Sequence, residues 1–158
     1  PRLIIPLASS GSTIIDFFVA LAVFFILALF FQVTITFNLL TVPLLLLLTY
    51  LLAVGAGLWV SALSVFYRDF VYALPFAIQI IMYASPLAYA TSLIPEQWRL
   101  LYAINPLVGI IQGFRWAMIA SGEFPAIELL ISFVISMLVF VGGLWLFRRV
   151  ERRFADII

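Results

Sequence analysis

The sequence contains no cysteine, no histidine and no lysine, and only 9% of its residues are charged. Without cysteine and histidine the chain has no disulfide, no thiolate nucleophile, few possible zinc ligands and no imidazole general base. Its acidic residues form no carboxylate pair spaced for one site, and no glycine-rich loop is suited to hold a phosphate. We therefore expect neither catalysis nor a bound cofactor or metal in this chain.

Apolar residues are what the chain has in excess. They make up 66% of its 158 residues, and the mean hydropathy is +1.28. Soluble domains are about 45–50% apolar and about 25% charged. A chain of this length cannot bury such an excess in one core, so lipid must solvate much of its surface. The sequence predicts an all-α integral membrane protein.

Four apolar stretches are long enough to cross a bilayer, whose hydrocarbon core takes about 20 helical residues. We predict membrane spans at about 14–33, 39–64, 70–90 and 126–147. Each should be a helix, because hydrocarbon offers no partner for an unpaired backbone group. None shows the apolar–polar alternation expected of a barrel strand.

The segment between the third and fourth spans, about residues 91–125, has a different character. Its apolar runs are each too short to span, and Asn105-Pro106 breaks it. A plain loop outside the membrane is the alternative, but the run 100–120 is too apolar for a solvated loop. We therefore predict a re-entrant helical hairpin, in which non-helical backbone is sheltered by protein.

The placement of the arginines predicts the orientation of the spans, because cytoplasmic loops carry an excess of basic residues. With the first residue inside, four crossings leave six of the eight arginines inside and two outside, and the opposite orientation reverses these numbers. Both ends of the chain are therefore predicted to be cytoplasmic. The six inner arginines are Arg2, Arg68, Arg148, Arg149, Arg152 and Arg153.

A tyrosine–arginine–aspartate turn, Tyr67-Arg68-Asp69, lies on the same predicted side. Near the bilayer centre, arginine or aspartate would each cost about 2.5–3.5 kcal/mol, whereas at the headgroups the cost is small. A stop signal with a positive-inside bias explains the turn, and a docking point for a soluble partner is the alternative. The basic "RRVERRF" tail is expected to anchor the last helix to an anionic inner leaflet.

Small and polar residues within the spans have local interpretations. Thr13 and Asp16 have the spacing of a capping box, so we interpret Asp16 as a cap at the start of the first span, with an intramembrane ion or proton site as the alternative. Ala53, Gly57 and Ser61 recur every four residues and predict a face that another helix approaches closely.

A stripe on the third span consists of Tyr72, Phe76, Gln79 and Tyr83, which share one helical face. Aromatic rings stack on sugars, and an amide or phenol can bond their hydroxyl groups, so the stripe would suit a wet polysaccharide passage. The alternative is that these side chains bond neighbouring helices, as polar groups in membrane helices commonly do.

Aromatic and polar residues also gather in the predicted hairpin. Tryptophan and tyrosine are typical of the membrane–water interface, and a gate that meets an emerging polymer is the other interpretation. The residues in question are Trp98, Tyr102, Asn105, Pro106, Arg115 and Trp116.

Three stretches together resemble the permease subunits of ABC exporters for polysaccharides and polyol phosphates, the channel proteins of O-antigen, capsule and teichoic acid export. They are "PRLIIPLA", "SALSVFYRDF" and "SPLAYATSLIPEQWRLLYAINPLVGIIQGFRWAMI", of which "YRD" and the "NP…GFRW" run are the most specific. The family permease has six spans. The resemblance therefore implies that residues 1–158 form part of one permease domain, without two N-terminal spans.

The resemblance also implies roles for particular residues. It places Pro1 and Arg2 in one cytoplasmic loop and Tyr67-Arg68-Asp69 in the next, both at the contact with a separate ATPase. It places 91–125 at the external mouth. Two permease copies and two nucleotide-binding subunits would move a lipid-linked polysaccharide or polyol phosphate polymer outward across the cytoplasmic (inner) membrane. No nucleic acid partner is implied.

Two other classes of protein remain candidates. A related ABC permease would export drugs or small lipid-linked molecules, and a neighbouring glycosyltransferase gene would favour the polysaccharide exporter over it. A membrane-embedded transferase or a structural bundle is more remote. An enzyme should show acids or histidines clustered at one membrane face, and a structural bundle would not need the broken hairpin.

Overall fold

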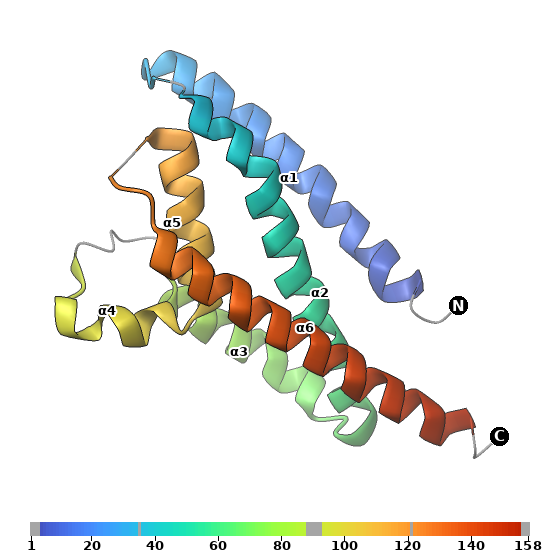
Figure 1. Cartoon of the computed structure of the whole chain (residues 1–158). Helices are drawn as coiled ribbons and strands as arrows, with labels where there is room; N and C mark the ends of the chain where they lie inside the picture. Colours follow the sequence, from blue (N-terminus) through green and yellow to red (C-terminus); the bar gives the residue numbers. More distant parts are fainter. Residues whose placement is uncertain (1–3, 35, 88–92, 121, 156–158) are drawn as a thin grey trace.

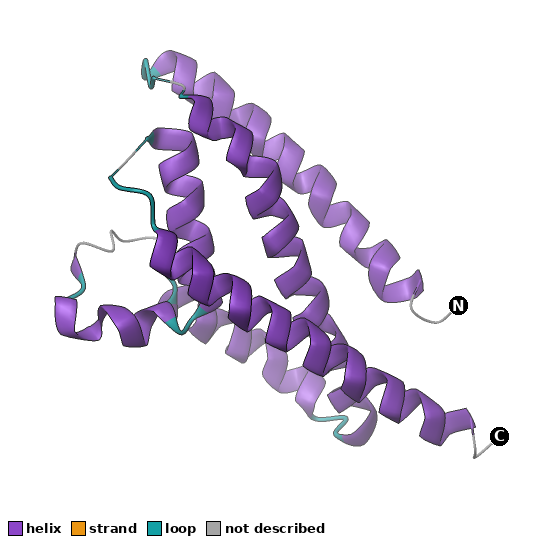
Figure 2. Cartoon of the chain, viewed as in Figure 1, coloured by secondary structure: helices purple, strands orange, loops and turns teal. Residues whose placement is uncertain are grey.

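The computed structural model describes residues 4–34, 36–87, 93–120 and 122–155, and every regular element in these ranges is a helix (Figure 1; Figure 2). The all-α prediction is confirmed. In chain order the elements are α1 Ile4–Phe30, a 3₁₀ helix η1 Phe37–Thr41, α2 Val42–Phe66, α3 Phe70–Ala84, α4 Glu96–Ala103, α5 Pro106–Ile119 and α6 Ala126–Ala155.

Two of the described helical segments are long and apolar enough to cross a membrane, Phe37–Phe66 and Ala126–Glu151. The apolar part of α1, Ile15–Phe30, and the whole of α3 are shorter. At 1.5 Å per residue, α3 extends for only about 22 Å, which is less than the roughly 30 Å of a hydrocarbon core. That there are four spans stays a prediction, while two membrane-length helices are established.

Helix α1 begins well before the predicted start of the first span. Because it begins at Ile4, Asp16 lies about three turns inside it, and the interpretation of Asp16 as an N-terminal cap was wrong. The small and polar residues before Asp16 carry no strong helical signal in the sequence, but they continue the helix. Pro6 lies in the first turn, where a missing N–H costs nothing.

Helices α2 and α6 form the most extensive contact between described elements, and small residues bring their backbones together. A Cβ on Gly55 would lie 2.8 Å from the Cα of Phe140, and one on Gly143 would lie 2.7 Å from the Gly55 carbonyl oxygen. The indole Nε1 of Trp59 donates a hydrogen bond of 2.9 Å to the carbonyl of Val139. Glycine is therefore required at this contact.

The predicted small-residue face of α2 is a different one; no described helix packs on it, and its approach by another helix stays a prediction. Ala53 and Gly57 are exposed, and a Cβ on Gly57 would meet nothing within 4 Å. The face that packs on α6 carries Gly55, Leu58 and Ala62 instead, all of them buried. Small residues occur on two faces of α2, and their spacing alone does not show which face is packed.

Helix α5 fills the space between the starts of α2 and α6. Its Ala117 is buried with Val42 and Leu45 of α2, and the rings of Phe17 on α1 and Phe114 on α5 lie 6.0 Å apart. Residues 106–119 are therefore held by three other helices. Together α4 and α5 occupy the segment for which we predict a re-entrant hairpin, and its depth in a membrane stays a prediction.

The ends of the helices divide between two ends of the molecule. The described start of α1, the turn between α2 and α3, and the end of α6 lie towards the lower right of Figure 1, whereas η1 and the end of α5 lie towards the upper left. The predicted orientation requires the start of the chain, the turn between α2 and α3 and the end of α6 to lie on one side of the membrane, as this arrangement allows. Which of the two ends faces the cytoplasm stays a prediction.

Candidate functional site

The predicted coupling turn is an exposed corner between α2 and α3. Tyr67 is 66% exposed, and Arg68 and Asp69 are exposed as well. Backbone bonds shape the corner: the N–H of Tyr67 donates to the Leu63 carbonyl at 2.9 Å, and that of Phe70 donates to the Tyr67 carbonyl at 3.1 Å. The turn is thus built by its backbone, which leaves its side chains available for a partner.

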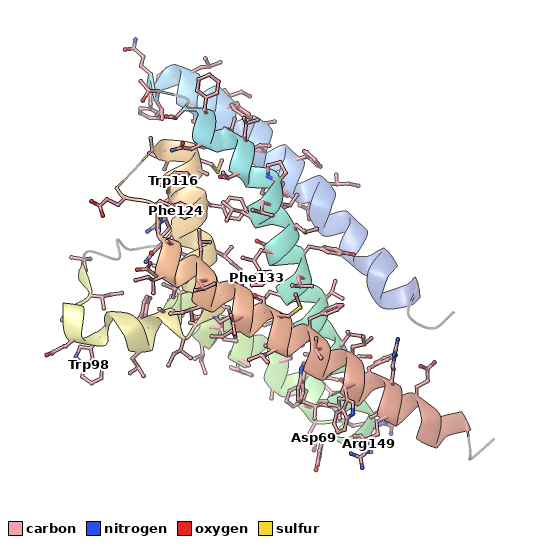
Figure 3. All side chains as sticks on the ribbon, viewed as in Figure 1. Asp69, Trp98, Trp116, Phe124, Phe133 and Arg149 are labelled. Carbon is pink, nitrogen blue, oxygen red and sulfur yellow. The ribbon has the colours of Figure 1, made fainter. Side chains whose placement is uncertain are left out.

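Asp69 directly precedes the first residue of α3 but does not cap the helix through its side chain. A carboxylate at this position still favours the helix, because the N-terminal end of the helix dipole is positive. Figure 3 shows Asp69 and Arg149 of α6 at the same end of the molecule. The guanidinium of Arg149 lies 5.2 Å from the ring centroid of Trp145. Pro1 and Arg2, the other predicted coupling residues, lie outside the described residues.

The predicted stripe lies on the outer surface of α3. Tyr72 is 78% exposed, Phe76 70% and Tyr83 68%, and Gln79 is exposed too. Among the described helices α3 packs only on α2. Tyr72, Phe76 and Gln79 are thus presented to the surroundings of the described chain and are not buried between its helices.

A polar junction joins the residues after α3 to α5. We use this name for Ser85, Pro86, Asn105 and Arg115. Ser85, at the C-terminal end of α3, is only 1% exposed, and its Oγ donates to the Ile81 carbonyl at 2.7 Å. The same Oγ accepts a 2.9 Å hydrogen bond from Asn105 Nδ2. Two segments that are twenty residues apart in sequence are therefore bonded inside the protein.

Asn105 also starts α5, because its Oδ1 accepts a hydrogen bond from the Leu107 N–H at 3.1 Å and Pro106 follows as the first helical residue. Arg115, almost three turns further along α5, completes the junction. Its Nη2 donates to the carbonyls of Pro86 at 2.5 Å and of Leu87 at 3.3 Å. The guanidinium thus binds two successive carbonyls just beyond the end of α3.

The aromatic residues of the hairpin fall into two groups. Trp98 on α4 is 54% exposed (Figure 3), as expected for a side chain at a membrane interface or a mouth. Trp116 on α5 is packed instead: its ring meets that of Phe124 edge to face, with centroids 4.8 Å apart. Tyr102 on α4 is half-buried. The six predicted interface residues are therefore not one cluster.

Helix α5 touches α6 so closely that no side chain fits at Gly109. A Cβ there would collide with the Glu128 carbonyl oxygen and with the Ser132 hydroxyl. Glu128 lies in the first turn of α6. Ser132 and Ser136, one turn apart on α6, are fully buried, and neither hydroxyl has a hydrogen-bond partner among the described residues. The α5–α6 contact is therefore tight and fixes the position of the junction.

An open apolar cavity of about 740 Å³ lies between the first half of α2, α5 and the first half of α6. Leucines of α2, Trp116 of α5, and Leu129, Phe133 and Met137 of α6 form much of its wall. In the described part of the chain no three acidic side chains lie together as metal ligands would.

Sequence reasoning singled out Asn105, Pro106 and Arg115 but missed Ser85. A signal for the Asn105 cap exists in the sequence, since asparagine before proline is a typical start of a helix. No comparable signal points to Ser85. Its significance lies in a partner twenty residues away, which only the folded chain brings close.

The chain matches known proteins over most of its length. Residues 1–119 match the sequence profile of the family described as ABC-2 type transporter. Two proteins from Klebsiella pneumoniae, each named O-antigen export system permease protein RfbA, are 26% and 25% identical to it over 117 residues, which is 74% of this chain. The match covers 45% of each of them, so the chain spans about half the length of these curated relatives. No solved structure matches the chain.

Proposed function

The chain belongs to the ABC-2 type transporter family, and on that premise we propose that it serves an ATP-driven exporter of a lipid-linked polysaccharide or polyol phosphate polymer. Proteins of this family are membrane subunits of transporters; they are not themselves catalytic and normally work with an ABC ATPase. In the proposal the polymer moves outward across the cytoplasmic membrane. Two copies of the permease line the passage, and two nucleotide-binding subunits hydrolyse ATP.

The observation that carries the proposal is the match to two O-antigen export permeases together with the match to the family. The chemistry of α3 supports a sugar polymer as the cargo. Its outer face offers three aromatic rings and an amide, which can stack on sugar rings and bond their hydroxyl groups. A passage for an apolar drug would need fewer polar groups on such a face.

The exposed turn at Tyr67-Arg68-Asp69 supports a role in coupling. It lies at the same end as the described start of α1 (Figure 1), so one soluble partner could contact both. On ATP binding, closure of the nucleotide-binding subunits would push on this corner. The push would reach α3 directly, because Asp69 immediately precedes that helix.

Deleting the gene in its native cells tests the proposed cargo. We expect the lipid-linked polymer to accumulate on the cytoplasmic side and to disappear from the cell surface. Inactivating the nucleotide-binding subunit should give the same result, because ATP hydrolysis drives the movement. Unchanged surface polymer together with reduced drug efflux would contradict the proposal and would favour the drug exporter instead.

The stripe on α3 gives a prediction about the passage. Replacing Tyr72 and Phe76 together by alanine is expected to reduce polymer export about thirtyfold, because two stacking platforms worth about 1 kcal/mol each are lost. Folding should be little affected, since these side chains are 78% and 70% exposed. Export by cells with matched permease levels is the measurement.

Ile78→Ala is the matched control for the stripe. Ile78 is 57% exposed on the same helix but lies on another face, about 120° away from Tyr72. The control should export normally. Equal losses in the control and in the double variant would contradict a passage along the stripe, because they would reflect a general need for bulky side chains on α3.

A further inference from the structure

Helix α3 makes few packing contacts along its length, and it is attached to the rest of the described chain mainly at its two ends. In the described part of the chain it packs only on α2, and most side chains from Val71 to Ala84 are exposed. Its start is the exposed Asp69 corner, and its end is the buried Ser85. The contacts that locate its far end are therefore those of the polar junction, not those of a packed face.

The junction is the stronger of the two attachments. Arg115 brings a formal charge to the carbonyls of Pro86 and Leu87, and charge-assisted hydrogen bonds are roughly twice as strong as neutral ones. Ser85 and Pro86 are buried, so breaking a bond here would leave a polar group unpaired away from water. The end of α3 should thus stay in place under a load that moves its beginning.

The other side of the junction is rigid. Helix α5 lies against α6 with no space for a side chain at Gly109, and Ala117 near its end is buried with Val42 and Leu45 of α2. Because α5 is fixed to both membrane-length segments, it can serve as a support for α3. A bond to a mobile loop could not do this.

We propose that the polar junction is a pivot for α3: Arg115 and Asn105 hold the outer end of the helix while its Asp69 end swings. The inference rests on the proposed function, since it takes the Tyr67-Arg68-Asp69 turn as the point of push. Pro75, which interrupts the backbone bonds inside α3, allows the helix to bend as it moves. Arg115 and Asn105 are positioning residues on this view, and the stripe lies between the pivot and the push.

Two pairs of spin labels test the pivot in the permease–ATPase complex. Residues 1–158 contain no cysteine, and any cysteine elsewhere in the complex is first replaced by serine. The outer pair is Met82→Cys with Ile119→Cys, and the inner pair is Val71→Cys with Ile119→Cys. All three positions are 45–51% exposed. Trapping the ATPase with ATP and vanadate should shift the inner distance and leave the outer distance unchanged.

Loss of the pivot should be visible in the same measurement. Arg115→Gln is expected to broaden the outer distance distribution and to reduce export per ATP hydrolysed about tenfold. Arg115→Lys keeps a charge and can bond one carbonyl. Its outer distance distribution and its export per ATP should lie between those of Arg115→Gln and those of the unchanged protein. Gln112→Ala, a change on α5 outside the junction, should behave like the unchanged protein.

Several results would overturn the pivot. In the unchanged protein, trapping with ATP and vanadate would contradict the pivot if it shifted both distances equally. It would also contradict the pivot if it left the inner distance unchanged. A narrow outer distance with normal export per ATP in Arg115→Gln would overturn it too. The distances do not depend on the cargo. Nucleotide-driven shifts of the inner distance, in a transporter whose gene deletion leaves the surface polymer unchanged, would therefore support the pivot while contradicting the proposed cargo.

Discussion

Replacing Arg68 and Asp69 together by alanine should leave ATP hydrolysis running and lower polymer export per ATP by about 5–150-fold, the usual range of coupling between two sites. The turn that contains them is exposed, and its shape depends on backbone hydrogen bonds. Truncating the two side chains should therefore not disturb the fold. What is lost is the contact through which the motor moves α3.

The measurement is export of polymer and vanadate-sensitive ATP hydrolysis in the same cells or vesicles, at matched permease levels. Arg149→Ala is the control, because Arg149 is an exposed arginine at the same end of the molecule but on α6 (Figure 3). The control should retain most of its coupling. Normal export by the double variant at normal membrane levels would contradict a role for this turn.

Alanine at Gly109 is expected to destabilise the protein by about 1–3 kcal/mol or more, the usual cost of overpacking. The new Cβ would collide with a backbone carbonyl of α6, which cannot move away as a flexible side chain could. Helix α5 would have to separate from α6, and the polar junction would move with it. Thermal unfolding in detergent should therefore show a clearly lower midpoint.

Gly57→Ala is the matched control, since it makes the same change on α2 where a Cβ would meet nothing within 4 Å. Alanine favours a helix over glycine by up to about 1 kcal/mol, so this variant should be unchanged or slightly more stable. Adding Ser132→Ala to Gly109→Ala should not restore stability, because the Glu128 carbonyl remains in the way. Equal midpoints for the two glycine variants would contradict the tight α5–α6 contact.

Much of the fold could be predicted because it depends on local signals. Long apolar runs indicated the helices, and Asn105-Pro106 indicated the break at which α5 begins. The start of α1 at Ile4 could not be predicted, since small and polar residues before Asp16 are compatible with both helix and loop. The choice of Gly55 over Gly57 as the packed glycine depends on where α6 lies.

In the candidate site, too, the features that depend on local signals could be predicted and those that depend on tertiary packing could not. The exposed turn at Arg68 and Asp69 could be located from charge alone, because charges are costly elsewhere in so apolar a chain. The junction could not, because its bonds join Ser85 to Asn105 and Arg115 to Pro86, 20 and 29 residues apart. Such pairs are set by tertiary packing and leave no periodic pattern.

The central claim is that the turn between α2 and α3 faces the cytoplasm, on the side of the motor, while η1 faces outward. Single cysteines at Asp69 and at Phe37, which is 89% exposed at the other end, test it with a membrane-impermeant thiol reagent. In intact cells we predict labelling at Phe37→Cys alone, and in inverted vesicles at Asp69→Cys alone. Labelling of Asp69→Cys from outside intact cells would contradict the account.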